Sequence, residues 1–214
     1  MITPRRLARL LLLPLLTLTL TLTMPARAIE EPDFRVVRQL ADAVEVRELA
    51  AYSVAEIVVP GPAGDAGKQA FPILAGYIFG KNKGERKLAM TAPVTQVAVP
   101  VKLEMTAPVT QAATPGGFLV QFTLPKGVTA ASAPVPDDLR VMLRDVAPRR
   151  IAVIRYSGFW SASNDAEHLA TLQAALKAVP LAWTGEPEIA RYNAPFTPWF
   201  LRRNEIWLSL TEAP

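Results

Sequence analysis

The chain has 214 residues, of which 50% are hydrophobic, with no cysteine and a formal net charge of +4. The absence of cysteine excludes disulfides, thiol catalysis and a lipid-modified cysteine, and a chain of this length buries enough apolar surface in one domain to fold without disulfides. The four arginines among residues 1–28 account for the whole basic excess. The balanced remainder argues against nucleic-acid binding, which requires a basic excess or a basic stripe.

Residues 1–28 have the three parts of a secretory signal peptide. Three arginines precede an apolar run of 15 residues at 10–24, and Ala26-Arg27-Ala28 follows. A helix that spans a bilayer needs about 20 apolar residues, so this run is too short. We therefore predict cleavage after Ala28 and a periplasmic or secreted domain at 29–214 with no membrane span. An uncleaved amphipathic anchor is the alternative, and the general secretory and twin-arginine routes both stay open.

The first half of the predicted domain reads as strands around one helix. Residues 29–43 are polar and weakly patterned. A helix is predicted over 67–79, with Pro72 in its first turns or at a kink. Alternating or β-branched runs predict strands at 44–49, 54–59, 87–91, 101–106 and 118–124.

The second half repeats this organisation. A helix runs to about Val179, where Pro180 stops it, and Ser163, Asn164 or Asp165 is expected to cap its start. Its apolar stripe consists of Leu169, Leu172, Leu176 and Val179. Strands are predicted at 139–145, 151–156, 188–192 and 205–210.

The order of strands, helix and strands thus occurs twice, which indicates an internal pseudo-repeat. Consecutive strands are too close in sequence for the crossover helices that parallel pairing needs. The predicted fold class is therefore α+β, a distorted β-barrel built from two pseudo-repeats with two flanking helices.

A duplicated segment is the sharpest local signal. Leu-Ala-Met-Thr-Ala-Pro-Val-Thr-Gln at 88–96 recurs at 103–111 with one change, so Met90 and Met105 occupy equivalent places. Both methionines alternate with polar or small residues and are expected to face inward with Leu88 and Leu103. They either line the core or form the wall of an apolar ligand pocket, for which an adaptable thioether is suited.

Three segments resemble the SOUL haem-binding protein family: KLAMTAPVTQ at 87–96, RYSGF at 155–159 and RYNAPFTPWFLRRNEIWL at 191–208. Together and in this order they are specific, and the last is the most diagnostic. The resemblance covers nearly all of the chain after residue 28. It implies a distorted barrel of two pseudo-repeats with two helices. It also implies haem or another tetrapyrrole bound in a shallow apolar groove, with basic groups at the propionates.

The resemblance also suggests one residue that would contact the ligand. In some members a helix-borne basic residue meets the propionates, and Lys68 stands at a roughly corresponding place, nine residues before Tyr77. With Met90, Met105 and Arg202 these residues form the predicted cofactor-binding set. For the Arg202-Arg203-Asn204-Glu205 run, a structural ion pair with Glu205 is the alternative to anion binding.

The single histidine, His168, lies beside the apolar stripe of the second helix rather than within it. Methionine, tyrosine and lysine are conceivable axial ligands, but none is in an arrangement that singles it out. We therefore predict haem binding without a strong axial ligand from the protein, and no other metal site.

Two other functions stay open beside a non-catalytic tetrapyrrole binder. The family is similar in architecture to bacterial effector-binding domains, so another apolar small molecule is an alternative ligand. A hydrolase is a further alternative, with Tyr77, Glu85, Glu104 or Tyr156 as its catalytic residues. The chain has no HExxH, CxxC, P-loop or GxGxxG motif, and its one histidine leaves no Ser-His-Asp arrangement.

Overall fold

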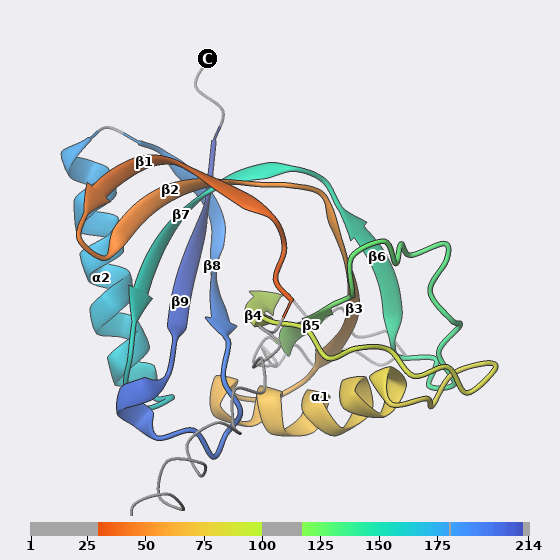
Figure 1. The fold of residues 1–214 in the computed structure, drawn as a ribbon. Helices are drawn as coiled ribbons and strands as arrows, with labels where there is room; N and C mark the ends of the chain where they lie inside the picture. The colour runs from red at the N-terminus through yellow and green to blue at the C-terminus, as the bar shows by residue number, and fades with distance from the viewer. Residues whose placement is uncertain (1–29, 100–116, 180, 212–214) are drawn as a thin grey trace, which may run out of the picture.

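The structure, a computed structural model, describes residues 30–99, 117–179 and 181–211. These residues form nine strands, two α-helices and a short 3-10 helix (Figure 1). In chain order they are β1 (Phe34–Ala41), β2 (Val44–Leu49), β3 (Tyr52–Val59), α1 (Ala63–Ile78), β4 (Val94–Val99), β5 (Gly117–Thr123), β6 (Met142–Val146), β7 (Arg149–Tyr156), α2 (Ala162–Ala178), β8 (Trp183–Arg191), η1 (Trp199–Leu201) and β9 (Asn204–Leu210).

The strands form one antiparallel sheet in the order β1-β2-β7-β9-β8-β4-β5-β3-β6. The predicted α+β class with two helices is confirmed. In the described part of the chain, β1 and β6 end the sheet and do not pair with each other. The sheet is therefore open rather than a closed barrel over these residues.

The predicted pseudo-repeat is visible in the topology. One unit, β3-α1-β4-β5, gives the strand order β4-β5-β3, and the other, β7-α2-β8-β9, gives β8-β9-β7. The units meet where β4 pairs with β8. The strand that precedes each unit pairs with the opposite one, β2 with β7 and β6 with β3. The two halves of the chain are therefore joined by three strand pairs, β4 with β8, β2 with β7 and β6 with β3.

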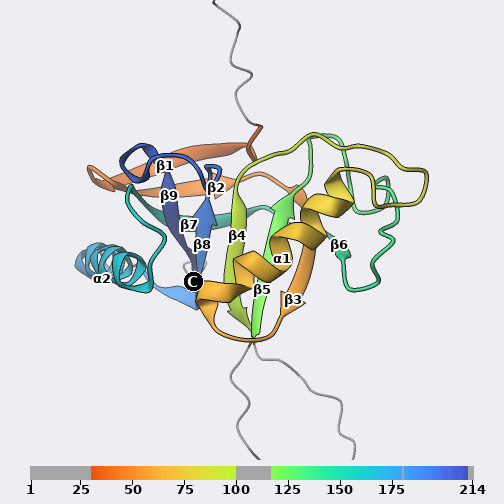
Figure 2. The ribbon, with the colours of Figure 1, turned by 90° about the horizontal axis from the view of Figure 1, so that it is seen from below.

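Both helices cover the same face of the sheet, each over the strands of its own unit (Figure 2). Ala66, Ala70 and Leu74 of α1 are fully buried against β3 and β5. Leu172 and Leu176 of the predicted stripe are fully buried between α2 and the strands β7 and β9. Burial of these two apolar faces is the main force that holds the helices on the sheet.

The opposite face of the sheet is more polar. Trp207, Val153 and Leu49 form a small apolar cluster there. Buried charged and amide side chains also lie on this face, among them Glu205 and Glu56, since their neighbours in the strands face the helices. Glu56 is neutralised by Arg144, whose Nη2 lies 3.0 Å from its Oε2, and Gln121 donates a second hydrogen bond to the same oxygen at 2.7 Å.

The duplicated segment departs from its prediction. Residues 87–91 form no strand, since the amide of Leu88 donates to the carbonyl of Ile78 at the end of α1 instead of joining the sheet. The strand, β4, begins after Pro93, because proline has no N–H to give to a ladder. Leu88 packs half-buried against the α1 core as expected, but Met90 is exposed. The predicted strand at 101–106, with Leu103 and Met105, lies outside the described residues.

Other boundaries differ as well. Helix α1 begins at Ala63 rather than at residue 67, so Pro72 lies inside the helix rather than in its first turns, and β8 begins at Trp183 rather than at residue 188. β1 lies in the segment for which no strand was predicted. It is an edge strand, largely exposed and paired only with β2, so its sequence shows no clear alternation of apolar and polar residues. The cap of α2 is Ser161, whose hydroxyl accepts a hydrogen bond from the amide of Asn164. The three predicted cap residues lie instead within the first turn, because the helix starts one residue after Ser161.

Candidate functional site

A group of exposed aromatic and apolar side chains lies at one edge of the molecule. Of the fifteen large hydrophobic side chains that are exposed in the described residues, six belong to the β7–α2 and β8–β9 connections. They are Phe159, Trp160, Phe196, Trp199, Phe200 and Leu201, and we name them the aromatic patch. Groups of exposed apolar side chains on a protein surface often mark a site that binds a ligand, a protein or a membrane.

The β8–β9 connection is held in shape by one arginine. The Arg202 guanidinium donates from Nε to the carbonyl of Thr197 at 2.8 Å and from Nη2 to the carbonyl of Pro195 at 2.7 Å. Proline at 195 and 198 restricts the backbone of the same stretch. The turn of η1 then presents its aromatic side chains to the outside.

The two connections are locked together by ring stacking and by a buried amide. The Phe159 and Trp199 rings stack with centroids 5.3 Å apart. Asn204, fully buried at the start of β9, accepts a hydrogen bond from Trp160 Nε1 at 2.9 Å and donates to the carbonyl of Gly158 at 3.4 Å. The amide of Gly158 in turn donates to the carbonyl of Trp199. The patch is therefore a preformed surface rather than a set of loose side chains.

Glycine is required at position 158. Its φ is +117°, a conformation that other residues rarely adopt, and a Cβ there would meet the Asn164 amide at 2.8 Å. This turn places Phe159 beside the β8–β9 connection.

Two arginine side chains lie beside the Trp160 ring of the aromatic patch. The Arg202 guanidinium lies 4.5 Å from the centroid of the Trp160 ring, and that of Arg191 lies 5.8 Å from it. Arg191 is neutralised by Asp165 at 2.6 Å. The sequence has no aspartate or glutamate from 189 to 204. A flat apolar molecule that carries carboxylates matches this combination of rings and guanidinium.

The His168 side chain packs α2 against β7. Its ring stacks on Tyr156 at 4.1 Å, and its Nδ1 lies 2.7 Å from the carbonyl of Asn164. The Tyr156 hydroxyl donates to Asp165 at 2.6 Å, and burial together with this carboxylate raises the pKa of Tyr156 well above its usual value. In the described residues no group of three or more His, Asp or Glu side chains is placed to hold a metal ion.

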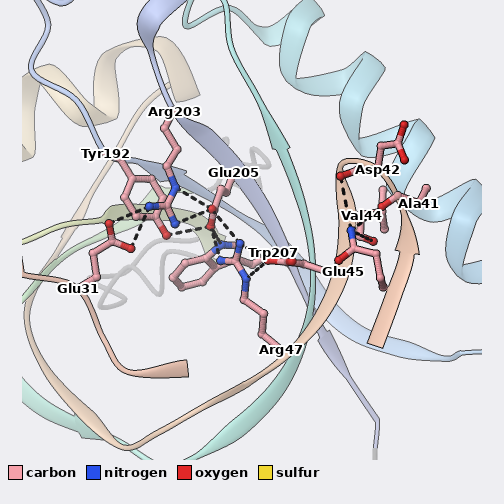
Figure 3. Close-up of polar contacts among 11 residues, drawn as sticks. Glu31, Ala41, Asp42, Val44, Glu45, Arg47, Tyr192, Arg203, Glu205 and Trp207 are labelled. Carbon is pink, nitrogen blue, oxygen red and sulfur yellow. Dashed lines mark hydrogen bonds and ion pairs between the residues drawn. The ribbon is translucent and has the colours of Figure 1, made fainter. Parts of the chain in front are cut away.

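A cluster of polar side chains surrounds Glu205, whose carboxylate accepts hydrogen bonds from four of them (Figure 3). The carboxylate is fully buried and accepts hydrogen bonds from Arg47 at 2.9 Å, Arg203 at 2.9 Å, the Tyr192 hydroxyl at 2.8 Å and Trp207 Nε1 at 2.8 Å. Burial opposes its ionisation, but these donors hold the pKa of Glu205 below its usual value. The arrangement stabilises the sheet, and it bears out the ion-pair interpretation for Arg203.

The predicted cofactor-binding residues do not come together at one place. Arg202 is at the aromatic patch. Lys68 lies on the outer surface of α1 with its side chain 82% exposed, 3.5 Å from Asp65. Tyr77 is in the core, where its hydroxyl donates to the carbonyl of Pro134, and burial raises its pKa to about 12. Met90 is exposed in the segment before β4, and Met105 lies outside the described residues.

The candidate catalytic residues are placed as follows. Tyr77 and Tyr156 are buried with their hydroxyls engaged. Glu85 lies in the exposed connection after α1. Glu104 falls outside the described residues.

Sequence reasoning passed over most of the aromatic patch. Phe159, Trp160 and Trp199 stand in irregular segments, where no period distinguishes a buried side chain from an exposed one. The available signal was compositional, since the Pro-Phe-Thr-Pro-Trp-Phe-Leu stretch concentrates large apolar residues where neither helix nor strand is predicted.

No helix in the described residues has both the length and the apolar character needed to cross a membrane.

Comparison with solved structures shows the fold. The C-terminal domain of EcmrR matches with a TM-score of 0.57 at 9% identity, over 79% of this chain and 98% of that one. An uncharacterized conserved protein from Listeria innocua matches with a TM-score of 0.58 at 12% identity, over 78% of this chain and 92% of that one. At such low identity these likenesses concern the fold alone.

Comparison of sequences points to one family. The chain is 28% identical to Heme-binding protein 2 of Mus musculus and 30% identical to Heme-binding protein 2 of Homo sapiens, each over 145 residues. These alignments cover 67% of this chain and 66% of each relative, slightly less than two thirds of their length. The family model described as SOUL heme-binding protein matches residues 29–209. The chain therefore belongs to the SOUL heme-binding protein family.

Proposed function

We propose that this protein binds haem or another flat tetrapyrrole without catalysing a reaction on it, and that it does so at the aromatic patch. Family membership supports haem binding in general. The observation that carries the location is the stacked pair of Phe159 and Trp199, which is exposed and lies beside the Trp160–Arg202 pair.

The chemistry of a tetrapyrrole fits this surface. The macrocycle offers a broad apolar face to the aromatic rings, and each propionate offers a carboxylate to a guanidinium. Arg202 already lies over an indole and shapes the connection, so it serves the patch both as a scaffold and as its nearest cation.

Binding through the face of the macrocycle does not require a strong axial ligand. His168 is engaged with Tyr156 and Asn164. We therefore expect metal-free protoporphyrin to bind about as tightly as haemin. Iron-dependent binding would instead point to a ligand among residues that this proposal does not use. Competition with unrelated apolar cations separates a tetrapyrrole binder from a general binder of apolar molecules.

The proposal includes export. Residues 1–28 would act as a cleaved signal peptide, and the domain would meet its ligand in the periplasm or outside the cell.

A haemin titration followed by absorption tests the location. Trp199→Ser should weaken binding about tenfold or more, because it removes one stacking ring and its apolar area. Phe79→Ser is a suitable control, since Phe79 is an exposed aromatic residue at the far end of α1. Circular dichroism of each variant checks that the fold is kept. Equal haemin affinity for the wild type and a folded Trp199→Ser variant would rule out this site.

A further inference from the structure

The outermost part of the aromatic patch exposes more apolar surface than a stacking site needs. Phe196 is 89% exposed, Leu201 64% and Phe200 59%. Side chains of this size are seldom left so open in a group on a soluble protein unless something covers them. The η1 connection lies away from the C-terminal end of α1 in both views (Figures 1 and 2).

Part of the backbone of this connection is satisfied internally. Arg202 supplies donors to the carbonyls of Pro195 and Thr197. The amide of Thr197 donates to Ala194, and that of Leu201 donates to Pro198. Prolines at 195 and 198 have no amide hydrogen to satisfy. This segment can therefore enter an environment poor in hydrogen-bonding partners without leaving these groups unpaired.

We propose that the aromatic patch docks the protein onto the surface of an anionic phospholipid bilayer. Trp and Phe with a neighbouring arginine are the side chains that settle at the boundary between headgroups and acyl chains. The absence of carboxylates from 189 to 204 avoids repulsion from anionic headgroups.

Docking does not depend on the proposed function, although the two are compatible. A tetrapyrrole is apolar enough to dissolve in a bilayer, so a patch that touches lipid would collect or release it without passage through water. The bilayer contact itself needs no haem and is measured in its absence.

Vesicle binding tests the inference. The protein is used as it is recovered from the expressing cells, and every variant is shown by mass spectrometry to carry the same N terminus. Cosedimentation is measured with phosphatidylcholine vesicles that contain or lack phosphatidylglycerol. Wild-type protein should bind the anionic vesicles, and the double variant Phe200→Ser/Leu201→Ser should lose at least about tenfold in affinity, given the apolar area removed. Phe79→Ser, which alters a side chain with the same 59% exposure as Phe200, should bind as the wild type does.

Tryptophan fluorescence locates the contact. Trp160 and Trp199 belong to the patch, whereas Trp207 is buried in the sheet. Brominated lipids should quench part of the wild-type emission, and Trp199→Phe should remove much of that quenching. Wild-type protein that ignores anionic vesicles, or equal binding by the double variant, would overturn the inference. Concentration-dependent dimerisation that the double variant abolishes, without vesicle binding, would also overturn it and assign the patch to a second copy. A haemin titration without lipid reports separately on the proposed function.

Discussion

At the scale of single residues, Glu205 shows how a buried carboxylate stays charged in the sheet. Taking it out of water is costly, and Arg47, Arg203, Tyr192 and Trp207 offset that cost by direct hydrogen bonds. Arg203 also holds Glu31 at 2.8 Å, so the segment before β1 is tied to β9 through the same guanidinium. Removing the central charge would leave the buried Arg47 and the half-buried Arg203 without their shared partner.

Glu205→Gln should lower the free energy of unfolding by about 3 kcal/mol or more at neutral pH, the usual cost of breaking a buried ion pair from one side. The folded pKa of Glu205 lies below its usual value of 4.5. Its contribution is therefore complete above pH 4.5 and is lost as the pH falls through the folded pKa.

Urea unfolding at neutral and acidic pH measures both effects. Glu48→Gln, at an exposed pair with Arg35, is the control and should change stability by less than about 1 kcal/mol. A Glu205→Gln protein as stable as the wild type at neutral pH would mean that the cluster does not stabilise the fold.

His168→Ala should leave the Soret change on haemin binding in place. The ring packs on Tyr156 and bonds to the Asn164 carbonyl, so its loss affects α2 rather than the patch. Absorption spectra of the variant with haemin measure this. Loss of the Soret change in a variant that stays folded would make His168 an axial ligand.

At the scale of elements, irregular connections carry the candidate site and regular elements position it. β7 and β9 are neighbours in the sheet, with Tyr156 opposite Asn204, so the connections that follow β7 and precede β9 emerge together. Asn204 then fixes Trp160, and the Gly158 turn brings Phe159 onto Trp199. The patch depends on this pairing of strands more than on either connection alone.

The start of α2 allows a direct test of its cap. Ser161→Ala should destabilise the protein by about 1 kcal/mol, because the hydroxyl satisfies the free amide of Asn164. Ser163→Ala, one residue inside the helix, should have little effect on stability. Thermal or urea unfolding of the pair decides between them, and a larger loss from Ser163→Ala would move the cap to that residue.

At the scale of the whole molecule, two similar units share one sheet, and the strand that precedes each unit pairs with the other unit. Each helix covers its own unit on one face, while the charged cluster around Glu205 occupies the other. The pairing of β2 with β7 and of β6 with β3 makes the two units depend on each other. We therefore expect the described domain to unfold as a single cooperative unit.

Export is a property of the whole chain. The recovered protein should begin at Ile29, because the apolar run at 10–24 is too short to span a bilayer and a small-x-small site follows it. Mass spectrometry of protein from the periplasm or medium measures this. An intact Met1 on a membrane-bound chain would contradict it.

The sequence by itself determined the α+β class, the two helices, the internal repeat and the family. Burial of an apolar face imposes a period on each helix and strand, and that period can be read locally, as in Leu172 and Leu176. β1 was not predicted because an edge strand with few buried side chains lacks such a period. The core position of Tyr77 and the exposure of Met90 were likewise decided by packing.

Only the tertiary structure decided the candidate site. Arg202 was named from its place in the closing segment, yet its partners, the carbonyls of Pro195 and Thr197 and the Trp160 ring, follow from how the connections fold. Phe159 and Trp199 are forty residues apart in sequence and stack because β7 and β9 are neighbours in the sheet. Exposure and contact between distant segments depend on strand order, and no local pattern of residue types encodes that order.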